Sequence, residues 1–195
     1  KCLVVIAHPI SDSLCHSMAQ SAIAALVANG HEVQVEDLYR SGFSPLLTVG
    51  ERESYYGPLF DSTDVREQLS RLLSAEALVL VFPTWWFGFP AILKGGLTGR
   101  GLLVSLTITQ LTSADQAKAP PSQKSIGCYF SWVTLVVDRL VLWQPVKRVL
   151  KAALLGTCAP ACRFEMLSLY QAERLTQPQV RQFCSRIEHA LSKWS

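Results

Sequence analysis

The chain has 195 residues, of which 49% are hydrophobic and 17% are charged, a composition that excludes an intrinsically disordered protein. Its 18 basic and 15 acidic residues give a formal net charge of +3, an excess too small and too scattered for a nucleic-acid groove. The length predicts a single domain, residues 1–195, built around one hydrophobic core.

The N-terminal part of the chain predicts a strand, a helix and a second strand. Residues 2–7 form a continuous apolar run, which is typical of a parallel strand buried on both faces. Apolar side chains then recur at helical spacing from residue 13 to residue 29, where Asn29-Gly30 supplies a stop signal. Residues 31–38 alternate between polar and apolar, which predicts a strand near the edge of a sheet with one face in water.

The following residues complete a β-α-β-α-β unit. Residues 40–60 are polar and contain Gly and Pro, so they predict a long surface connection. Residues 61–74 predict an amphipathic helix and residues 77–82 a buried strand. Strands that alternate with helices imply a parallel sheet with helices on both faces, and such sheets bind ligands beyond the carboxyl ends of their strands. The loops after Ala7 and Phe82 are therefore expected to hold a site.

The second half of the chain has a weaker pattern. Residues 144–155 and 177–193 predict helices, and residues 163–170 predict a strand between them. Two further strands are predicted for residues 102–111 and 125–137, separated by a polar loop.

An uncharged apolar stretch, residues 77–93, approaches the length of a membrane span. Pro83, Gly88 and Pro90 divide it, so we expect a buried strand and a loop there, and no integral membrane segment. The six cysteines include no C-x-x-C pair and no set completed by histidine, so no metal site is expected. Reduced thiols and the lack of a recognisable signal peptide favour the cytoplasm.

The loop after the first predicted strand, residues 8–16, combines histidines and hydroxyl groups with the start of a helix. Ser13, Leu14 and Cys15 open that helix, and the N–H groups of a helix N-terminus suit the phosphate of an anionic cofactor. A polar residue of the loop could instead do no more than cap the helix. His8 could likewise contact the phosphate or have a structural role.

Aromatic side chains concentrate in the segment that follows the third predicted strand. Its residues are Pro83, Thr84, Trp85, Trp86, Phe87 and Gly88. A tricyclic flavin needs apolar walls for its ring and backbone donors for its N5 and O4 atoms, and this segment offers both. The alternative is that the rings fill the gap between sheet and helix. We favour the flavin site, because so many apolar side chains in one loop exceed what such a gap needs.

Four strings of residues resemble the flavodoxin-like NAD(P)H dehydrogenase (quinone) family. The longest and most specific is Trp86-Phe87-Gly88-Phe89-Pro90-Ala91-Ile92-Leu93-Lys94-Gly95. The others are Ala7-His8 after the first strand, Ser13-Leu14-Cys15 at the start of the helix, and Asp37-Leu38-Tyr39. The resemblance covers about residues 1–95 and again about residues 137–195.

This resemblance implies a fold and a set of cofactor contacts. The fold is an α/β class, flavodoxin-like three-layer α/β/α sandwich with a central five-stranded parallel sheet in the order 2-1-3-4-5. The phosphate side of the flavin would be bound by His8, Ser13, Leu14 and Cys15. The isoalloxazine ring would lie against Pro83, Thr84, Trp85, Trp86, Phe87 and Gly88.

The activity that the resemblance implies is a ping-pong transfer of two electrons by an NAD(P)H dehydrogenase (quinone). NADPH or NADH delivers hydride to flavin N5 and leaves, and a quinone or other aromatic acceptor then takes the electrons. The short chain favours FMN slightly, with FAD also possible, and a homodimer is expected. The alternative is a regulatory or ancillary subunit, for example of a potassium-efflux system, that keeps the fold with weak or no catalysis.

Residues 96–136 depart from the family's pattern. After Lys94-Gly95 the family continues with Trp, an apolar residue, an acid, Arg and Val, whereas this chain has Gly96-Leu97-Thr98-Gly99-Arg100-Gly101. The family's Thr-Thr-x-Gly-type turn after the fourth strand is also not found, so no catalytic residue is assigned. Our hypothesis is a shifted reading frame across this segment, which sequencing of the coding DNA would test.

Overall fold

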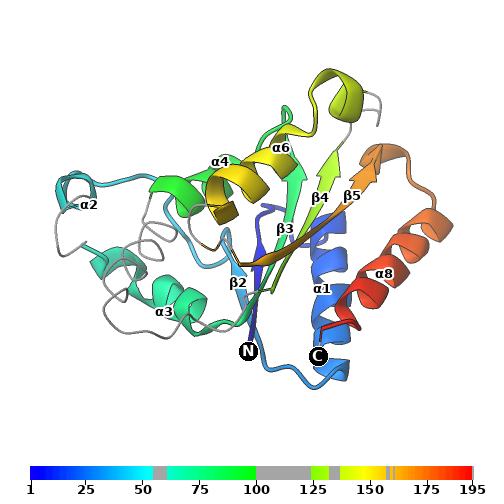
Figure 1. Cartoon of the computed structure of the whole chain (residues 1–195), viewed down its shortest axis with the longest axis horizontal. Coiled ribbons are helices and arrows are strands. Elements are labelled where there is room, and N and C mark those ends of the chain that lie inside the picture. The colour runs from blue at the N-terminus through cyan, green and yellow to red at the C-terminus, as the bar shows by residue number, and fades with distance from the viewer. Residues whose placement is uncertain (55–60, 100–123, 132–136, 157–158, 160, 195) are drawn as a thin grey trace.

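The computed structural model describes the chain except residues 55–60, 100–123, 132–136, 157–158, 160 and 195, and residues 98–99 and 124–131 through their backbone alone (Figure 1). Five parallel strands form one sheet in the order β2-β1-β3-β4-β5. The strands are β1 (Cys2–Ile6), β2 (Val33–Asp37), β3 (Ala77–Thr84), β4 (Lys124–Ser131) and β5 (Arg163–Tyr170). The predicted parallel sheet and its strand order are confirmed.

Helices lie on both sides of this sheet, as predicted (Figure 1). One face is covered by α1 (Leu14–Ala28) and α8 (Gln177–Leu191), which share a buried apolar cluster with the strands. On the other side lie α3 (Arg66–Ser74), α4 (Ala91–Lys94) and α6 (Pro145–Arg148). A second apolar cluster fills that side. The three layers explain why β1 and β3 are apolar without alternation.

The central strand β1 shows this two-sided burial directly. Val4 and Ile6 belong to the cluster beneath α1 and α8, whereas Val5 packs against the cluster on the opposite side. A strand of this kind needs an apolar residue at every position, because both of its faces are dry. The predicted strand at residues 2–7 is therefore confirmed, although it ends one residue earlier.

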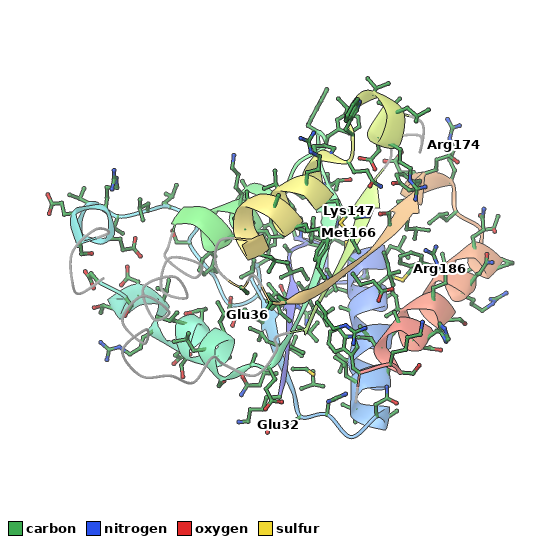
Figure 2. All side chains as sticks on the ribbon, viewed as in Figure 1. Glu32, Glu36, Lys147, Met166, Arg174 and Arg186 are labelled. Atoms are coloured by element: carbon green, nitrogen blue, oxygen red, sulfur yellow. The ribbon has the colours of Figure 1, made fainter. Side chains whose placement is uncertain are left out.

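The edge strand β2 has the water-exposed face that was predicted, but a valine lies on that face and a glutamate is buried on the other. Val35 is 44% exposed, whereas Glu36 is 5% exposed. The Glu36 carboxylate forms an ion pair with Arg71 of α3, on the α3 side of the sheet (Figure 2). A buried charge is stable only when it is paired. The ion pair with α3, the helix that covers this face, therefore explains why Glu36 is buried while Val35 is exposed.

Several element boundaries differ from the prediction. The connection at residues 40–60 contains a short helix, α2 (Val49–Ser54). The helix predicted from residue 61 begins as a 3₁₀ turn, η1 (Thr63–Val65), before α3. The helix predicted at residues 144–155 consists of α6 followed by the wider π-helical turns of η5 (Val149–Leu155).

The segment that departs from the family is described in part. The strand predicted at residues 102–111 lies outside the described residues. The strand predicted at 125–137 is present as β4, but Val137 already belongs to a helical turn, η4 (Val137–Val141), so its predicted end was wrong. A further 3₁₀ turn, η6 (Ala172–Arg174), separates β5 from α8.

Candidate functional site

The two loops singled out from the sequence leave neighbouring strands at the same edge of the sheet. Residues 8–16, here called the 8–16 loop, follow β1, and the aromatic residues follow β3. β1 and β3 are hydrogen-bonded neighbours, with Ile6 beside Val81. The strand order reverses at this pair, since β2 lies on the other side of β1. This is the point at which open α/β sheets bind their ligands.

The 8–16 loop ends in a hydrogen-bonded helix cap. Ser13 is the N-cap residue of α1: its backbone is extended, and its hydroxyl oxygen accepts a hydrogen bond from the backbone N–H of His16 at 3.4 Å. Leu14 and Cys15 follow as the first helical residues, so their backbone N–H groups lie at the N-terminal end of α1. The Cys15 side chain is 3% exposed and lies in the core, so only its backbone could contact a ligand.

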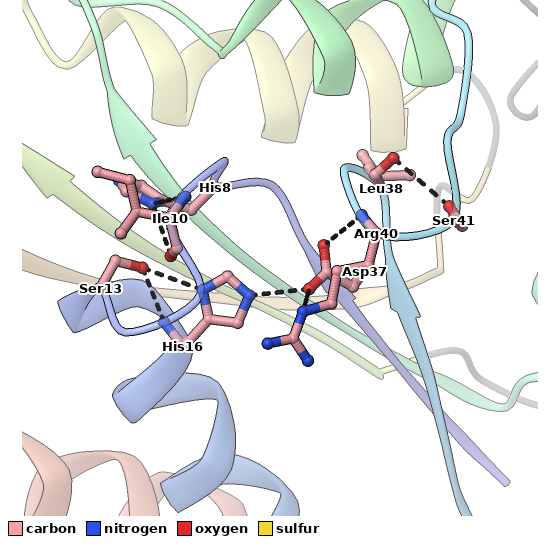
Figure 3. Close-up of polar contacts among 8 residues, drawn as sticks. All are labelled: His8, Ile10, Ser13, His16, Asp37, Leu38, Arg40 and Ser41. Carbon is pink, nitrogen blue, oxygen red and sulfur yellow. Dashed lines mark hydrogen bonds and ion pairs between the residues drawn. The ribbon is translucent and has the colours of Figure 1, made fainter.

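His16 is a buried residue of this loop that the sequence did not single out as a site residue. Its Nδ1 lies 3.0 Å from the Ser13 hydroxyl, and its Nε2 lies 2.8 Å from Oδ2 of Asp37, the last residue of β2 (Figure 3). Arg40 closes the cluster, because its backbone N–H donates to Asp37 Oδ1 at 3.2 Å. The helix start after β1 is thereby fastened to the end of β2.

A signal for this contact was present in the sequence. Parallel neighbouring strands end at the same edge of a sheet, so an acid that closes β2 lies beside the loop after β1. A histidine in the first turn of the helix, three residues after a candidate N-cap serine, is then within reach of that acid.

The aromatic residues form a tight turn with two strained positions. Trp85 and Gly88 pair in an antiparallel bridge, and the Gly88 N–H donates to the Trp85 carbonyl at 3.0 Å. Between them Trp86 and Phe87 have φ angles of 50° and 58°, in the left-handed region that bulky residues avoid. We call residues 85–88 the aromatic turn. Trp86 projects from its tip and is 95% exposed.

His8 brings the two halves together. Its ring centroid lies 6.1 Å from that of Trp85 and 6.4 Å from that of His16, which it meets edge-on. His8 Nδ1 lies 3.1 Å from the Ile10 backbone nitrogen and 3.2 Å from the Ile10 carbonyl oxygen, so the backbone of Ile10 contacts the ring through both of its polar groups. The aromatic turn and the 8–16 loop are therefore parts of one site region, linked by the His8 side chain.

Pro83 and Thr84 occupy a different setting from the rest of the aromatic segment. Both belong to β3, where they pair with Phe130 and Ser131 of β4, and both side chains are buried. The strand thus extends two residues beyond the predicted end at Phe82. These two residues can shape the floor beneath the aromatic turn, but their side chains do not form an exposed wall.

Comparison with known proteins identifies the family of this region. A family model described as the flavodoxin-like fold matches residues 1–97. Over these residues the chain belongs to the flavodoxin-like family. The site region lies entirely within the matched half.

Among curated proteins, the chain is 32% identical over 132 residues to NAD(P)H dehydrogenase [quinone] 1 of Rattus norvegicus, an alignment covering 60% of this chain and 48% of that protein. It is 36% identical over 98 residues to an uncharacterized NAD(P)H oxidoreductase of Escherichia coli, covering 47% of each chain. The chain thus spans about half the length of these relatives.

Solved structures resemble the whole flavodoxin-like fold at lower identity. An NAD(P)H:quinone oxidoreductase from Methanothermobacter marburgensis superposes with a TM-score of 0.79 and 20% identity, covering 98% of this chain and 94% of the other. An FMN-dependent NADH-azoreductase from Bacillus anthracis, solved with FMN, superposes with a TM-score of 0.66 and 14% identity over 99% of both chains. At such identities the likeness concerns the fold.

An apolar cavity lies behind the aromatic turn, between the matched half and a helical segment of the second half of the chain. It has a volume of about 320 Å³ and lies between the turn, at Phe87 and Gly88, and the helical segment at Val146 and Val149. Among the described residues that line it, Lys94 is the one with a cationic side chain. No residue of the 8–16 loop is among the described residues that line it, so the cavity adjoins only the aromatic half of the site.

The family-like string of residues 86–95 ends at Gly95, and close packing explains why this last residue is a glycine. A Cβ atom at Gly95 would overlap the backbone of Pro45, so the chain requires glycine there. The departure from the family pattern begins at the next residue. Gly96 and Leu97 still continue as a π-helical turn, η2 (Gly95–Gly99), in which Leu97 is buried.

Among the described residues, no group of three or more His, Cys, Asp or Glu side chains could bind a metal ion. No described helix combines the length and the apolar character that crossing a bilayer requires.

Proposed function

We propose that the chain is a flavin-dependent oxidoreductase that transfers two electrons from NAD(P)H to quinones or related aromatic acceptors. The observation that carries the proposal is the contact between His8 and Trp85, which joins a capped helix N-terminus to an aromatic turn at the carboxyl ends of neighbouring strands. A phosphate-bearing cofactor with a flat apolar ring needs both features side by side.

The chemistry of the available groups fits a flavin. The Ser13 hydroxyl and the first N–H groups of α1 suit a phosphate ester, and they lie at the positive end of a 15-residue helix. The rings of Trp85, Trp86 and Phe87 supply apolar surface. The ten residues that we propose as flavin contacts are His8, Ser13, Leu14, Cys15, Pro83, Thr84, Trp85, Trp86, Phe87 and Gly88.

In this proposal the protein binds and orients the flavin and the substrates, and it excludes water from them. The bound flavin would supply the chemistry of accepting and donating hydride. Ser13 and the helix N-terminus hold the phosphate end. The aromatic turn offers a face for the ring and for an aromatic acceptor, and the exposed Trp86 is available to stack on either. Strain in the backbone of this turn is the kind of cost that persists at binding sites.

The names of the relatives favour this activity over that of an ancillary subunit, since they are NAD(P)H dehydrogenases, oxidoreductases and an azoreductase. We further propose FMN as the cofactor, with FAD as the second choice, and a homodimer in which the exposed aromatic turn lies near the interface. A single domain over residues 1–195 and a cytoplasmic location complete the proposal.

The test uses the full chain and follows the visible absorption band of a bound flavin. We expect the purified protein to bind FMN, to lose the band when NADPH or NADH is added, and to regain it with a quinone. Ser13→Ala and Trp85→Ala should weaken FMN binding at least tenfold. Ser17→Ala changes an exposed serine one turn further along α1 and serves as the control.

Two outcomes would count against the proposal. A colourless protein that takes up neither FMN nor FAD would refute it. Bound flavin that no nicotinamide cofactor reduces would refute the activity and favour the ancillary-subunit alternative.

A further inference from the structure

The buried His16 side chain lies between a candidate ligand-binding hydroxyl and a carboxylate. Ser13 Oγ lies 3.0 Å from Nδ1 on one side, and Asp37 Oδ2 lies 2.8 Å from Nε2 on the other (Figure 3). The side chains of His16 and Asp37 are only 8% and 11% exposed. Two elements meet in this chain of contacts: α1, through its N-cap and its first turn, and the end of β2.

The hydrogen positions in this chain follow from what each group can do. The Asp37 carboxylate only accepts, and it already accepts from the backbone N–H of Arg40, so Nε2 of His16 donates to it. In a neutral ring Nδ1 then has a lone pair, and the Ser13 hydroxyl must donate its only hydrogen to that atom. In a protonated ring Nδ1–H donates to Ser13 Oγ, and the hydroxyl hydrogen is released.

This difference determines what Ser13 can offer to an anion. A phosphate oxygen is an acceptor and needs a donor. With neutral His16 the hydroxyl hydrogen is engaged inside the protein, so Ser13 presents only lone pairs to the phosphate. With protonated His16 the same hydroxyl can donate outward.

We propose that His16 is a positioning residue that couples binding of a phosphate ester at the start of α1 to the uptake of one proton. The proton comes from solvent and resides on Nδ1 of His16, and no covalent bond is made or broken. This inference rests on the proposed function, because it takes the flavin phosphate as the ligand of Ser13. His16 and Asp37 would not contact the ligand themselves.

The charged and titratable groups around His16 are consistent with such a switch. Asp37 at the end of β2 faces Nε2 of His16, and the Arg40 side chain lies against the same carboxylate, with its Nε 3.4 Å from Asp37 Oδ2. His8, after β1, presents its ring edge-on at 6.4 Å. Asp12 in the same loop is exposed. The positive end of α1 disfavours the imidazolium until an anion binds there.

The experiment compares FMN with riboflavin, which lacks the phosphate, on the full chain freed of flavin. Calorimetric titrations in two buffers with different ionisation enthalpies measure the protons taken up. Work above pH 7 keeps the phosphate largely dianionic, since its second pKa is about 6. We expect FMN to bind with uptake of up to about one proton, so that its Kd rises by up to about tenfold per pH unit. Riboflavin should bind without uptake.

Three variants separate the role of His16 from simple destabilisation. His16→Gln keeps groups that can hydrogen-bond to both neighbours but cannot titrate, so proton uptake should vanish and the preference for FMN over riboflavin should fall. Ser13→Ala should also abolish the uptake, whereas Ser13→Thr keeps the hydroxyl and the uptake. His31→Gln is the matched control, because His31 bonds the Trp194 carbonyl at 3.0 Å, at the other end of β2.

The outcomes distinguish failure of the role of His16 from failure of the proposed function. FMN that binds with no proton uptake, or with uptake that survives in His16→Gln or in Ser13→Ala, would overturn the role of His16 and leave the proposed function standing. A protein that binds neither FMN nor riboflavin would overturn both.

Discussion

The two halves of the candidate site are stabilised in opposite ways. Ser13 and His16 of the 8–16 loop form a mostly buried chain of hydrogen bonds with Asp37 at the end of β2. In the aromatic turn, Trp86 is almost fully exposed and shares a left-handed backbone conformation with Phe87. A bulky residue in that conformation costs about 1–2 kcal/mol. The polar half therefore contributes to folding, whereas the aromatic half reduces stability and persists for another reason.

The largest effect on the polar half should come from Asp37→Ala. It leaves Nε2 of His16 buried without its acceptor and removes the acceptor of the Arg40 N–H, so we expect a loss of about 3 kcal/mol in the free energy of unfolding. Asp37→Asn retains an acceptor oxygen and should lose less. Urea unfolding measures both. A loss below about 0.5 kcal/mol for Asp37→Ala would show that the buried chain contributes little to stability.

Ser13→Ala should have the next largest effect. It removes the cap of α1 and the partner of His16 Nδ1, and a cap alone is worth about 1 kcal/mol. Ser17→Ala, at an exposed position of the same helix, should stay within about 0.5 kcal/mol of the wild type. Equal stabilities for the two variants, again from urea unfolding, would mean that the cap is not a source of stability.

Trp86→Gly should act in the opposite direction. Glycine adopts a φ of 50° without strain, and the exposed indole ring buries little surface, so we expect a gain of about 1 kcal/mol in stability. Trp86→Ala removes the same ring but keeps a Cβ atom, so it should not show that gain. Both variants should bind FMN more weakly. If Trp86→Gly is no more stable than Trp86→Ala, backbone strain does not destabilise the aromatic turn and does not distinguish it from the polar half.

Much of the fold could be predicted because its signals are local or follow from burial. The strand at residues 163–170 was predicted with the boundaries that β5 has, and helix α1 lies within the helical pattern predicted from residue 13 to the stop at Asn29. Short helices were harder. α2 is preceded by a reciprocal pair in which the Thr48 N–H donates to Glu51 and the Glu51 N–H donates to Thr48. That Thr-x-x-Glu spacing is a capping-box signal within the connection that looked irregular.

The site was predicted in its composition but not in its geometry. A left-handed turn normally has Asn or Gly at its central positions, so nothing in the identity of Trp86 or Phe87 indicates their backbone conformation. The adjacency of β1 and β2 was predicted, but the distances between His16 and Asp37 depend on side-chain conformations that the sequence pattern does not indicate. The burial of Glu36 depends in the same way on where Arg71 of α3 lies.

The smallest prediction concerns an exposed carboxylate that contrasts with buried Asp37. Asp61 accepts hydrogen bonds from the hydroxyl and the N–H of Thr63, at 2.7 and 3.2 Å, and these bonds hold the pKa of Asp61 below its usual value. Thr63→Val should raise that pKa toward the usual value, and Thr63→Ser should restore it, as measured by NMR titration of the carboxyl carbon. Because the folded-state pKa is lowered, the stabilisation exists above the unfolded-state pKa and is lost as the pH falls through the folded-state value. Wild type and Thr63→Val should therefore converge in stability in acid. A difference that persists there would mean that the hydroxyl acts through packing rather than through the carboxylate.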